Sequence, residues 1–278
     1  MRLTPVYDSA PVLVIEGDPT AVVAPTIRQR LRFLDELAAL DDAAWATPSR
    51  CEGWTARDVI VHLDTTNAFW RFSIEAGLSG APTRFLVDFD PVASPAQMVA
   101  GAPDLAPAEL LARFDASTRA LCDLIGSLDP TGLEATAEAP PGHLAVSAVV
   151  HHALWDSLVH EHDVLDPLGV EVPHQDDEVL AALAYAAGLG AGYDLTRGVR
   201  RTGRLALVAS DPAACLSVQV ADQVRVAVVD EAPADADVVL RGSAHALLEQ
   251  LSVRAPLEHE VADDAAWLVS GLATVFDT

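Results

Sequence analysis

Two residues of different chemistry, Asp156 and His160, lie four positions apart in the segment "DSLVHEHDVLDPLG" and could share one metal ion. On an α-helix, residues i and i+4 lie on the same face, so a carboxylate and an imidazole at this spacing can bind one cation. His62 lies in an apolar stretch of another predicted helix, and antiparallel packing would bring its ring opposite the pair. Two imidazoles and one carboxylate suit Zn²⁺, and three protein ligands leave a fourth position open, as in catalytic sites. The residues therefore predict a metal site formed by His62, Asp156 and His160.

The same residues also fit simpler interpretations. The segment 151–162 carries four histidines beside acidic residues, which is typical of a solvated helix face with ordinary i to i+4 pairs. A single histidine such as His62 among apolar residues is common in protein cores. His152 lies four residues before Asp156 and could take the place of His62, so the spacing alone leaves two candidate ligand sets.

Four amphipathic segments can position these side chains. Apolar residues recur at helical spacing in residues 27–40, 55–77, 107–128 and 144–165. Thr55 and Asp58 form a start of the capping-box type for the second segment. Residues 78–106 are rich in Pro, Gly and Ala, and we predict a loop that could form a lid over a site. Four helices of this length predict a four-helix bundle.

The pattern changes after residue 176, where a further helix precedes four β-rich runs and two short helices. This order predicts a smaller α+β domain, with a mainly antiparallel sheet covered by helices on one face. The expected fold class is therefore α plus α+β. We expect an N-terminal extension at 1–25 with a possible strand in "PVLVIEG", the bundle at 26–172, and the α+β domain at 173–278.

Composition limits the classes of partner. The 278 residues include 17 basic residues, all Arg, and 41 acidic ones, for a net charge of −24. This charge disfavours nucleic acid and membrane surfaces as partners, because both are anionic. No apolar run approaches the roughly 20 residues that cross a bilayer, and no signal peptide is recognisable, so we expect a soluble cytoplasmic protein. Cys51, Cys122 and Cys215 are few and widely spaced, which predicts reduced thiols.

The first site segment carries a resemblance. "WATPSRCEGWTARDVIVHLDTT" resembles the entry to the second helix in the mycothiol-dependent maleylpyruvate isomerase family of DinB-like proteins, in which the histidine of W-T-x-R-D-x-x-x-H-L is a metal ligand. "DSLVHEHDVLDPLG" is similar to the family's Glu-x-x-x-His-x-x-Asp followed by Leu-Gly. The resemblance implies a DinB-like bundle that holds a divalent metal through His62, Asp156 and His160. Asp156 stands where the family commonly has Glu, so its helix must approach more closely or a water must bridge.

The C-terminal part carries a second resemblance. "ADVVLRGSAHALLEQLSVRAPLE" looks like the family's C-terminal domain, which is related in fold to sterol-carrier modules. The family's W-L-x-G-R becomes Leu251-Ser252-Val253-Arg254, without the glycine. The match implies that Arg254 is the functional arginine, whose planar fork could hold a carboxylate bidentately. A surface arginine favoured by the dipole at a helix end is the alternative.

The resemblance implies a thiol-dependent enzyme that uses mycothiol as cosubstrate. A metal would lower the pKa of the thiol, and the thiolate would add to an activated double bond of a small, anionic electrophile oriented by Arg254. Departure of the thiolate after bond rotation gives isomerisation, whereas its retention gives S-transfer, and the sequence does not choose between them. Cys51 lacks a recognisable histidine partner, so we expect no catalytic role for it.

Two other functions use the same residues. One is a binding protein without thiol chemistry that sequesters a small hydrophobic ligand in its C-terminal domain. The other is a metal-dependent hydrolase, in which Asp64 or Glu161 serves as the base. The sequence makes no prediction of the oligomeric state.

Overall fold

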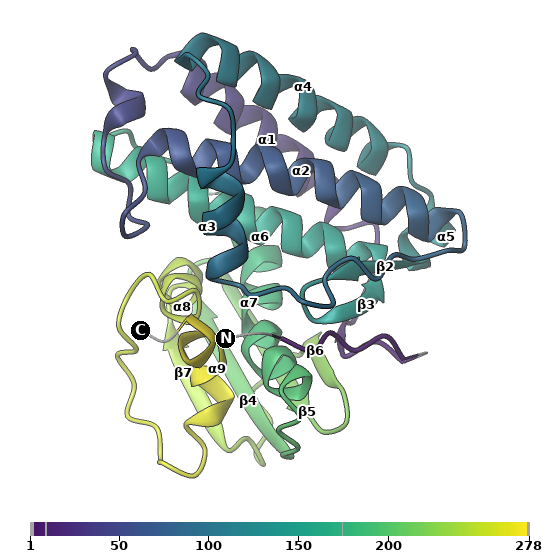
Figure 1. Cartoon of the computed structure of the whole chain (residues 1–278). Helices are drawn as coiled ribbons and strands as arrows, with labels where there is room; N and C mark the ends of the chain where they lie inside the picture. Colours follow the sequence, from purple (N-terminus) through teal and green to yellow (C-terminus); the bar gives the residue numbers. More distant parts are fainter. Residues whose placement is uncertain (1–2, 9, 174, 277–278) are drawn as a thin grey trace.

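Four long helices form the N-terminal bundle in the computed structural model, which describes residues 3–8, 10–173 and 175–276 (Figure 1). These helices are α1 (Val23–Ala38), α2 (Ala56–Leu78), α4 (Pro107–Gly126) and α6 (Val146–Leu165). Both α1 and α2 pack against α4 and α6, which closes the bundle. The predicted capping box begins α2: the Thr55 side chain accepts from the backbone of Asp58, whose carboxylate accepts from Thr55 in return.

The connections between these helices contain more structure than the sequence predicted. The expected loop at 78–106 includes the helix α3 (Ala93–Ala100), and the short helix α5 (Pro130–Glu134) follows α4. A hairpin of β2 (Thr136–Ala139) and β3 (Gly142–Ala145) replaces the loop expected around Pro140, and α6 begins after it at Val146. Two 3₁₀ turns, η1 (Ala44–Ala46) and η2 (Asp166–Leu168), lie near the start of α2 and the end of α6.

A five-stranded sheet forms the C-terminal part, in the order β1-β6-β5-β4-β7. Its strands are β1 (Leu13–Ile15), β4 (Gly203–Ser210), β5 (Ala213–Val220), β6 (Val224–Val228) and β7 (Val238–Gly242). The central strands β4, β5 and β6 pair antiparallel, while β1 and β7 join the edges in parallel. The helices α7 (Asp176–Thr196), α8 (Ala244–Leu251) and α9 (Trp267–Phe276) complete the α+β arrangement, and the predicted fold class is confirmed.

The N-terminal segment contacts both parts of the molecule. The strand expected in "PVLVIEG" is β1, which extends the C-terminal sheet beside β6. Upstream of it, the backbone N–H of Val6 donates to Pro141, and its carbonyl accepts from His143 on β3. Residues 3–8 and 10–15 therefore contact both the hairpin that precedes α6 and the sheet.

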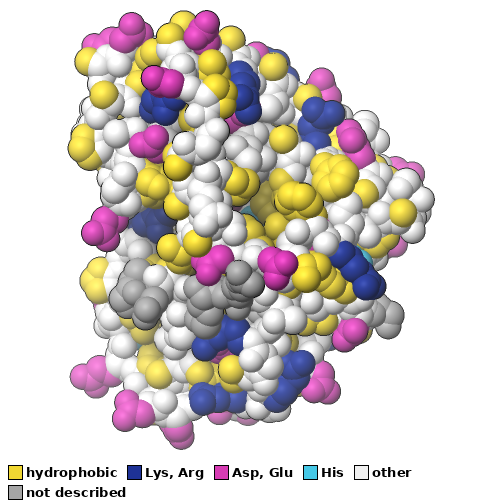
Figure 2. Space-filling model, viewed as in Figure 1, with side chains coloured by type: hydrophobic (Ala, Val, Ile, Leu, Met, Phe, Trp, Pro, Cys, Tyr) yellow, Lys and Arg dark blue, Asp and Glu magenta, His cyan; other side chains and the backbone are white. Residues whose placement is uncertain are grey.

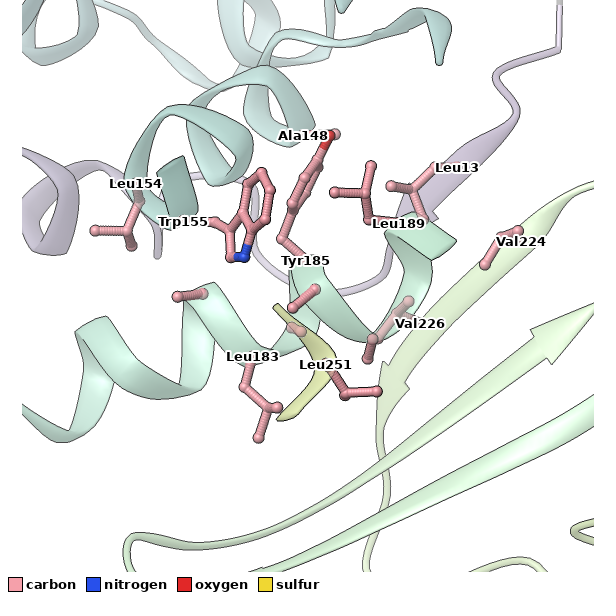
Figure 3. Packing of buried hydrophobic residues seen from close by; sticks show 14 of the residues in the cluster. Leu13, Ala148, Leu154, Trp155, Leu183, Tyr185, Leu189, Val224, Val226 and Leu251 are labelled. Atoms are coloured by element: carbon pink, nitrogen blue, oxygen red, sulfur yellow. The ribbon is translucent and has the colours of Figure 1, made fainter. Parts of the chain in front are cut away.

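The central helix α7 joins the bundle to the sheet. It packs against α6 and α1 on one side and against β1, β5, β6, α8 and α9 on others. Its length and composition would suit a membrane span, but 83% of its apolar window is buried inside the protein, which marks a core helix. Figure 3 shows the resulting continuous core, where Trp155 of α6 and Tyr185 of α7 lie near Val226 of β6.

Small residues on α7 allow this close packing. A Cβ atom at Gly271 of α9 would lie 2.3 Å from the backbone oxygen of Gly190, a distance that no side-chain movement can relieve. The contact between α7 and α9 therefore requires glycine at position 271.

We expect Gly271→Ala to lower the free energy of unfolding by about 1–3 kcal/mol, the usual cost of an overpacked contact. Gly192→Ala, on α7 itself, is the matched control, because nothing lies within 4 Å of the added Cβ. That control should be neutral or stabilising, since alanine favours a helix over glycine by about 0.8–1.0 kcal/mol. Urea denaturation followed by circular dichroism measures both, and equal stability of the two variants would contradict the packing argument.

Candidate metal centre

His62, Asp156 and His160 meet at the contact between α2 and α6. Asp156 Oδ1 lies 3.6 Å from Nε2 of His62 and 3.6 Å from Nε2 of His160. One ligand atom of each residue lies within 4.8 Å of the others, and each of the three side chains is at most 11% exposed. The structure thus brings together residues that are almost a hundred positions apart, and the shorter Asp156 reaches both rings because the two helices approach closely.

The donor geometry fits a divalent metal. Two ligand atoms bound to zinc at 2.0–2.2 Å and tetrahedral angles lie about 3.4 Å apart. The 3.6 Å separations match this value, whereas they are too long for direct hydrogen bonds between the three groups. The chemistry of the set, two imidazoles and a carboxylate, is also one that zinc accepts.

Asp163 orients one of these ligands. Its Oδ2 lies 2.8 Å from Nδ1 of His160, which leaves Nε2 of that ring directed at Asp156. Metal-binding histidines commonly carry such a carboxylate on their second nitrogen. In contrast, Nδ1 of His62 is buried without a hydrogen-bond partner among the described residues.

Arg254 completes this network from the C-terminal part. Its Nε donates to both carboxylate oxygens of Asp163, at 2.8 and 3.1 Å, and its Nη2 donates to Oδ2 at 2.8 Å. The Asp163 side chain has no exposed surface, so removal of its partner would leave a buried charge, at a cost of about 3–5 kcal/mol. The fork of Arg254, predicted to hold a substrate carboxylate, holds a carboxylate of the protein instead.

The turn before Arg254 has a backbone conformation that favours glycine, although valine occupies the position. Val253 has a φ of 60°, and it occupies the place of the glycine in the family's W-L-x-G-R. A β-branched residue in this left-handed region is strained. On either side of it, Ser252 accepts a hydrogen bond from Trp155, and Arg254 binds Asp163. These contacts hold the strained turn against the bundle.

Electrostatics favour charged ligands in this network. Burial opposes ionisation of Asp156, but the imidazoles of His62 and His160 hold its pKa below the usual range. Burial also lowers the pKa of His160, yet the hydrogen bond to Asp163 and the contact with Cys51 raise it to about 10. Burial raises the pKa of Asp163, but bonds from His160 and Arg254 lower it below its usual range. Without a metal, His160 is therefore protonated near neutral pH, and a cation must displace that proton.

His152, the alternative third ligand, has a different environment. Its Nδ1 lies 2.6 Å from the hydroxyl of Tyr185, and its ring packs against Trp70. Burial lowers the pKa of His152 to about 4, so this imidazole is neutral. It borders the cavity next to Asp156 but lies outside the cluster of ligand atoms.

The structure corrects the expectation for Cys51. The sequence offered no histidine partner, but Cys51 Sγ lies 3.6 Å from Nδ1 of His160 and donates to Asp163 at 3.1 Å. The sequence near Cys51 gives no sign of this contact, because His160 is more than a hundred residues away. Asp163 itself was present in the sequence as the residue three positions after His160, a spacing that places both on one helix face.

The two candidate hydrolase bases are held elsewhere. Asp64 accepts from Ser117 at 2.7 Å and pairs with Arg113, which ties α2 to α4. Glu161 is fully buried and accepts hydrogen bonds from Arg32 and Gln29 of α1. Neither carboxylate borders the cavity described below.

A cavity of about 840 Å³ opens onto the triad. It lies between α2, α6, the segment that contains α3, and the turn after α8. Figure 2 shows hydrophobic side chains gathered on this face around a hollow beside α3. His62, Asp156 and His160 all contribute to its lining, together with Cys51 and Arg254. A metal held by the triad would be accessible from this space.

A buried carboxylate fixes one wall of the cavity. Glu138 on β2 has no exposed surface and accepts from the hydroxyls of Tyr7 and Thr83, both at 2.6 Å. It also accepts from the backbone N–H groups of Phe85 and Leu86, both at 2.8 Å. The segment predicted as a loop that could form a lid is therefore bound to the hairpin through residues 83–86, and it forms a wall of the cavity.

Comparisons with known proteins agree with this architecture. The sequence profile of a family described as "Mycothiol maleylpyruvate isomerase N-terminal domain" matches residues 27–165. A crystal structure of the mycothiol-dependent maleylpyruvate isomerase superimposes with a TM-score of 0.60 at 16% identity, over 85% of this chain and 90% of that chain. A mutant of that enzyme gives the same TM-score at 15% identity and the same coverage. No curated protein sequence matches. At these identities, the solved structures show a shared fold.

Replacement of a ligand should separate the two candidate sets. We expect His62→Gln to weaken zinc affinity about a hundredfold or more, since loss of a group that only hydrogen-bonds to a metal ligand already costs typically 10–100-fold. The control His152→Gln removes the other candidate and should keep the affinity within a few-fold. Competition with a zinc-binding dye measures both variants after circular dichroism has confirmed their fold. Full affinity in His62→Gln would exclude the proposed triad.

The role of Asp163 can be tested through the metal as well. Asp163→Asn should lower zinc affinity about 10–100-fold, because a neutral amide orients and polarises His160 less than a carboxylate does. Asp166→Asn is the matched control, since Asp166 pairs with Arg50 and His162 rather than with a ligand. Equal zinc affinities of the two variants, measured by the same dye competition, would show that Asp163 has only a structural role.

Proposed function

The chain belongs to the mycothiol maleylpyruvate isomerase N-terminal domain family, and on this basis we propose that it is a metal-dependent enzyme that uses a low-molecular-weight thiol. The thiol is mycothiol, and the reaction is isomerisation or S-transfer on an electrophilic small molecule. One observation carries the proposal: three protein ligands converge at a large cavity and leave the side toward that cavity open. Such an arrangement is typical of catalytic rather than structural metal sites.

The residues of the triad have separate roles in this proposal. His62, Asp156 and His160 hold the divalent metal, most simply zinc, which supplies a positive charge that lowers the pKa of a coordinated thiol. Asp163 keeps the Nε2 atom of His160 directed into the site. Thr66, whose hydroxyl lies 3.5 Å from Asp156 Oδ2, stabilises the carboxylate at the oxygen other than Oδ1, which lies nearest the two imidazoles.

Arg254 serves this site indirectly. Because its guanidinium binds Asp163, it positions His160 through that carboxylate. It is thus a positioning residue that joins the turn after α8 to the metal centre. The cavity wall formed by residues 85–98 excludes water from the thiol and the electrophile.

The environments of Asp64 and Glu161 disfavour the hydrolase. Both carboxylates are engaged in pairs between bundle helices, so neither can activate water at the triad. A binding protein without thiol chemistry would share the cavity and the metal, and it differs from the proposed enzyme in its response to thiols.

Thiol titration of the Co²⁺-substituted protein tests the proposal. We expect mycothiol to produce a sulfur-to-cobalt charge-transfer band in the near ultraviolet, because the thiolate occupies the open ligand position. Glutathione should produce a weaker response, and His62→Gln should lose the band with the metal. If the protein binds cobalt fully but its absorption spectrum does not change on addition of mycothiol, the result would contradict thiol chemistry. It would favour the alternative function, a binding protein.

A further inference from the structure

The charged residues around the cavity indicate which class of electrophile the thiol attacks. We infer that the electrophile is a neutral compound with an apolar, ring-sized body, in place of the small anion that Arg254 was predicted to bind. The inference rests on the proposed function, since it names the class of compound that the thiol attacks.

The arginines at the cavity are already paired. Among the described residues that line it, the arginines are Arg50 and Arg254. Arg254 directs Nε and Nη2 at Asp163, while Arg50 pairs with Glu249 and, at 2.9 Å, with Asp166. Both guanidinium groups therefore neutralise carboxylates of the protein.

A substrate carboxylate could not readily recruit Arg254. The side chain of Asp163 has no exposed surface, and departure of the guanidinium would leave its charge less compensated in a low-dielectric environment. Asp163 occupies the Nε–Nη2 edge of the guanidinium. The remaining donors lie near protein groups as well, since Nη1 is 3.3 Å from the carbonyl oxygen of Ser252 and Nη2 is 3.7 Å from Cys51 Sγ. An anionic substrate would thus meet a guanidinium whose charge Asp163 already offsets, and it would have to compete with Ser252 and Cys51 for the remaining donors.

The metal centre leaves no positive charge for an anion either. The two charges of a divalent cation would be offset by Asp156 and by the thiolate. A further acid, Glu52, contributes to the cavity lining, and the chain as a whole carries a net charge of −24. The resulting field disfavours a carboxylate near the reacting atoms.

The remaining lining is aromatic. Phe69 and Trp70 of α2 have ring centroids 5.0 Å apart, and Phe85 from the fixed wall lies 6.1 Å from Phe69. Trp155 of α6 contributes a further ring to the lining. Phe85 is 71% exposed, and a large exposed aromatic side chain at the edge of a cavity is typical of a surface that binds an apolar ligand. Aromatic rings at these spacings offer edge and face contacts to another ring.

The size of the cavity fits two bound molecules. Its volume of about 840 Å³ lies near the upper end of the range of about 300–1,000 Å³ for pockets that hold drug-sized ligands. A small dicarboxylate beside the thiol would leave much of the aromatic wall uncovered. A ring-sized apolar body would cover it and bury that surface from water.

A matched pair of unreactive probes tests the inference by calorimetry. Naphthalene-2-carboxamide and naphthalene-2-carboxylate share size and shape but differ in charge. We expect the amide to bind the zinc-loaded, mycothiol-saturated protein about tenfold tighter or more, because the guanidinium groups of the described lining residues are already paired with carboxylates of the protein. The same titration on metal-free protein excludes direct coordination of the carboxylate by zinc and should give the same order. Equal or tighter binding of the carboxylate to the metal-free protein would overturn the inference.

Two variants identify the source of the preference. Phe69→Ala should weaken amide binding about tenfold, whereas Phe72→Ala, on the same helix but 51% exposed and outside the cavity lining, should leave it within twofold. Asp163→Asn frees the guanidinium of Arg254 and should strengthen carboxylate binding about tenfold. No gain in that variant would show that Arg254 is not the limiting group. The metal-free titrations need no thiol, so a preference for the amide would stand even if the cobalt experiment contradicted thiol chemistry.

Discussion

The buried carboxylate of Asp163 couples the two parts of the molecule to the geometry of the candidate metal centre. It receives hydrogen bonds from His160 within the bundle and from Arg254 in the turn after α8, and it has no contact with solvent. A buried charge of this kind is tolerated only where its partners are held in place. The position of the C-terminal part against the bundle and the direction of the His160 ring therefore depend on each other. Through this coupling, the C-terminal part can affect the geometry of the candidate metal centre without contributing one of the three candidate ligands.

Local patterns in the sequence were sufficient to predict the four long helices of the bundle and two of the three candidate ligands. The bundle helices follow from apolar residues at helical spacing, and the start of α2 follows from the capping box at Thr55. The i to i+4 spacing of Asp156 and His160 fixes two ligands on one face, because both lie on one helix. Residue spacing could not decide whether His62 or His152 is the third ligand, since both lie on buried helices. Family resemblance favoured His62, and the 3.6 Å distance from its Nε2 to Asp156 agrees with that choice.

Contacts between distant segments account for what the sequence did not predict. The hairpin β2–β3 is stabilised by Glu138, whose partners come from the N-terminal arm and from the segment after α2. No periodicity marks such a residue. For the same reason, the thiol of Cys51 was expected to lack a histidine, and the fork of Arg254 was expected to be available. In each case the residue type was informative about chemistry, but the partners that decide its role lie between about fifty and more than a hundred residues away.

The strained turn at Val253 indicates which of the possible roles of Arg254 the protein preserves. A β-branched residue at φ 60° is less stable than glycine there, and such strain persists only where neighbouring contacts determine the backbone. Those contacts are the hydrogen bond from Trp155 to Ser252 and the pairing of Arg254 with Asp163. If the guanidinium of Arg254 moved from Asp163 to a substrate in each turnover, each move would remove one of the contacts that hold the turn. An arginine fixed permanently on Asp163 avoids this, so the backbone strain and the charge pairing both favour a positioning role.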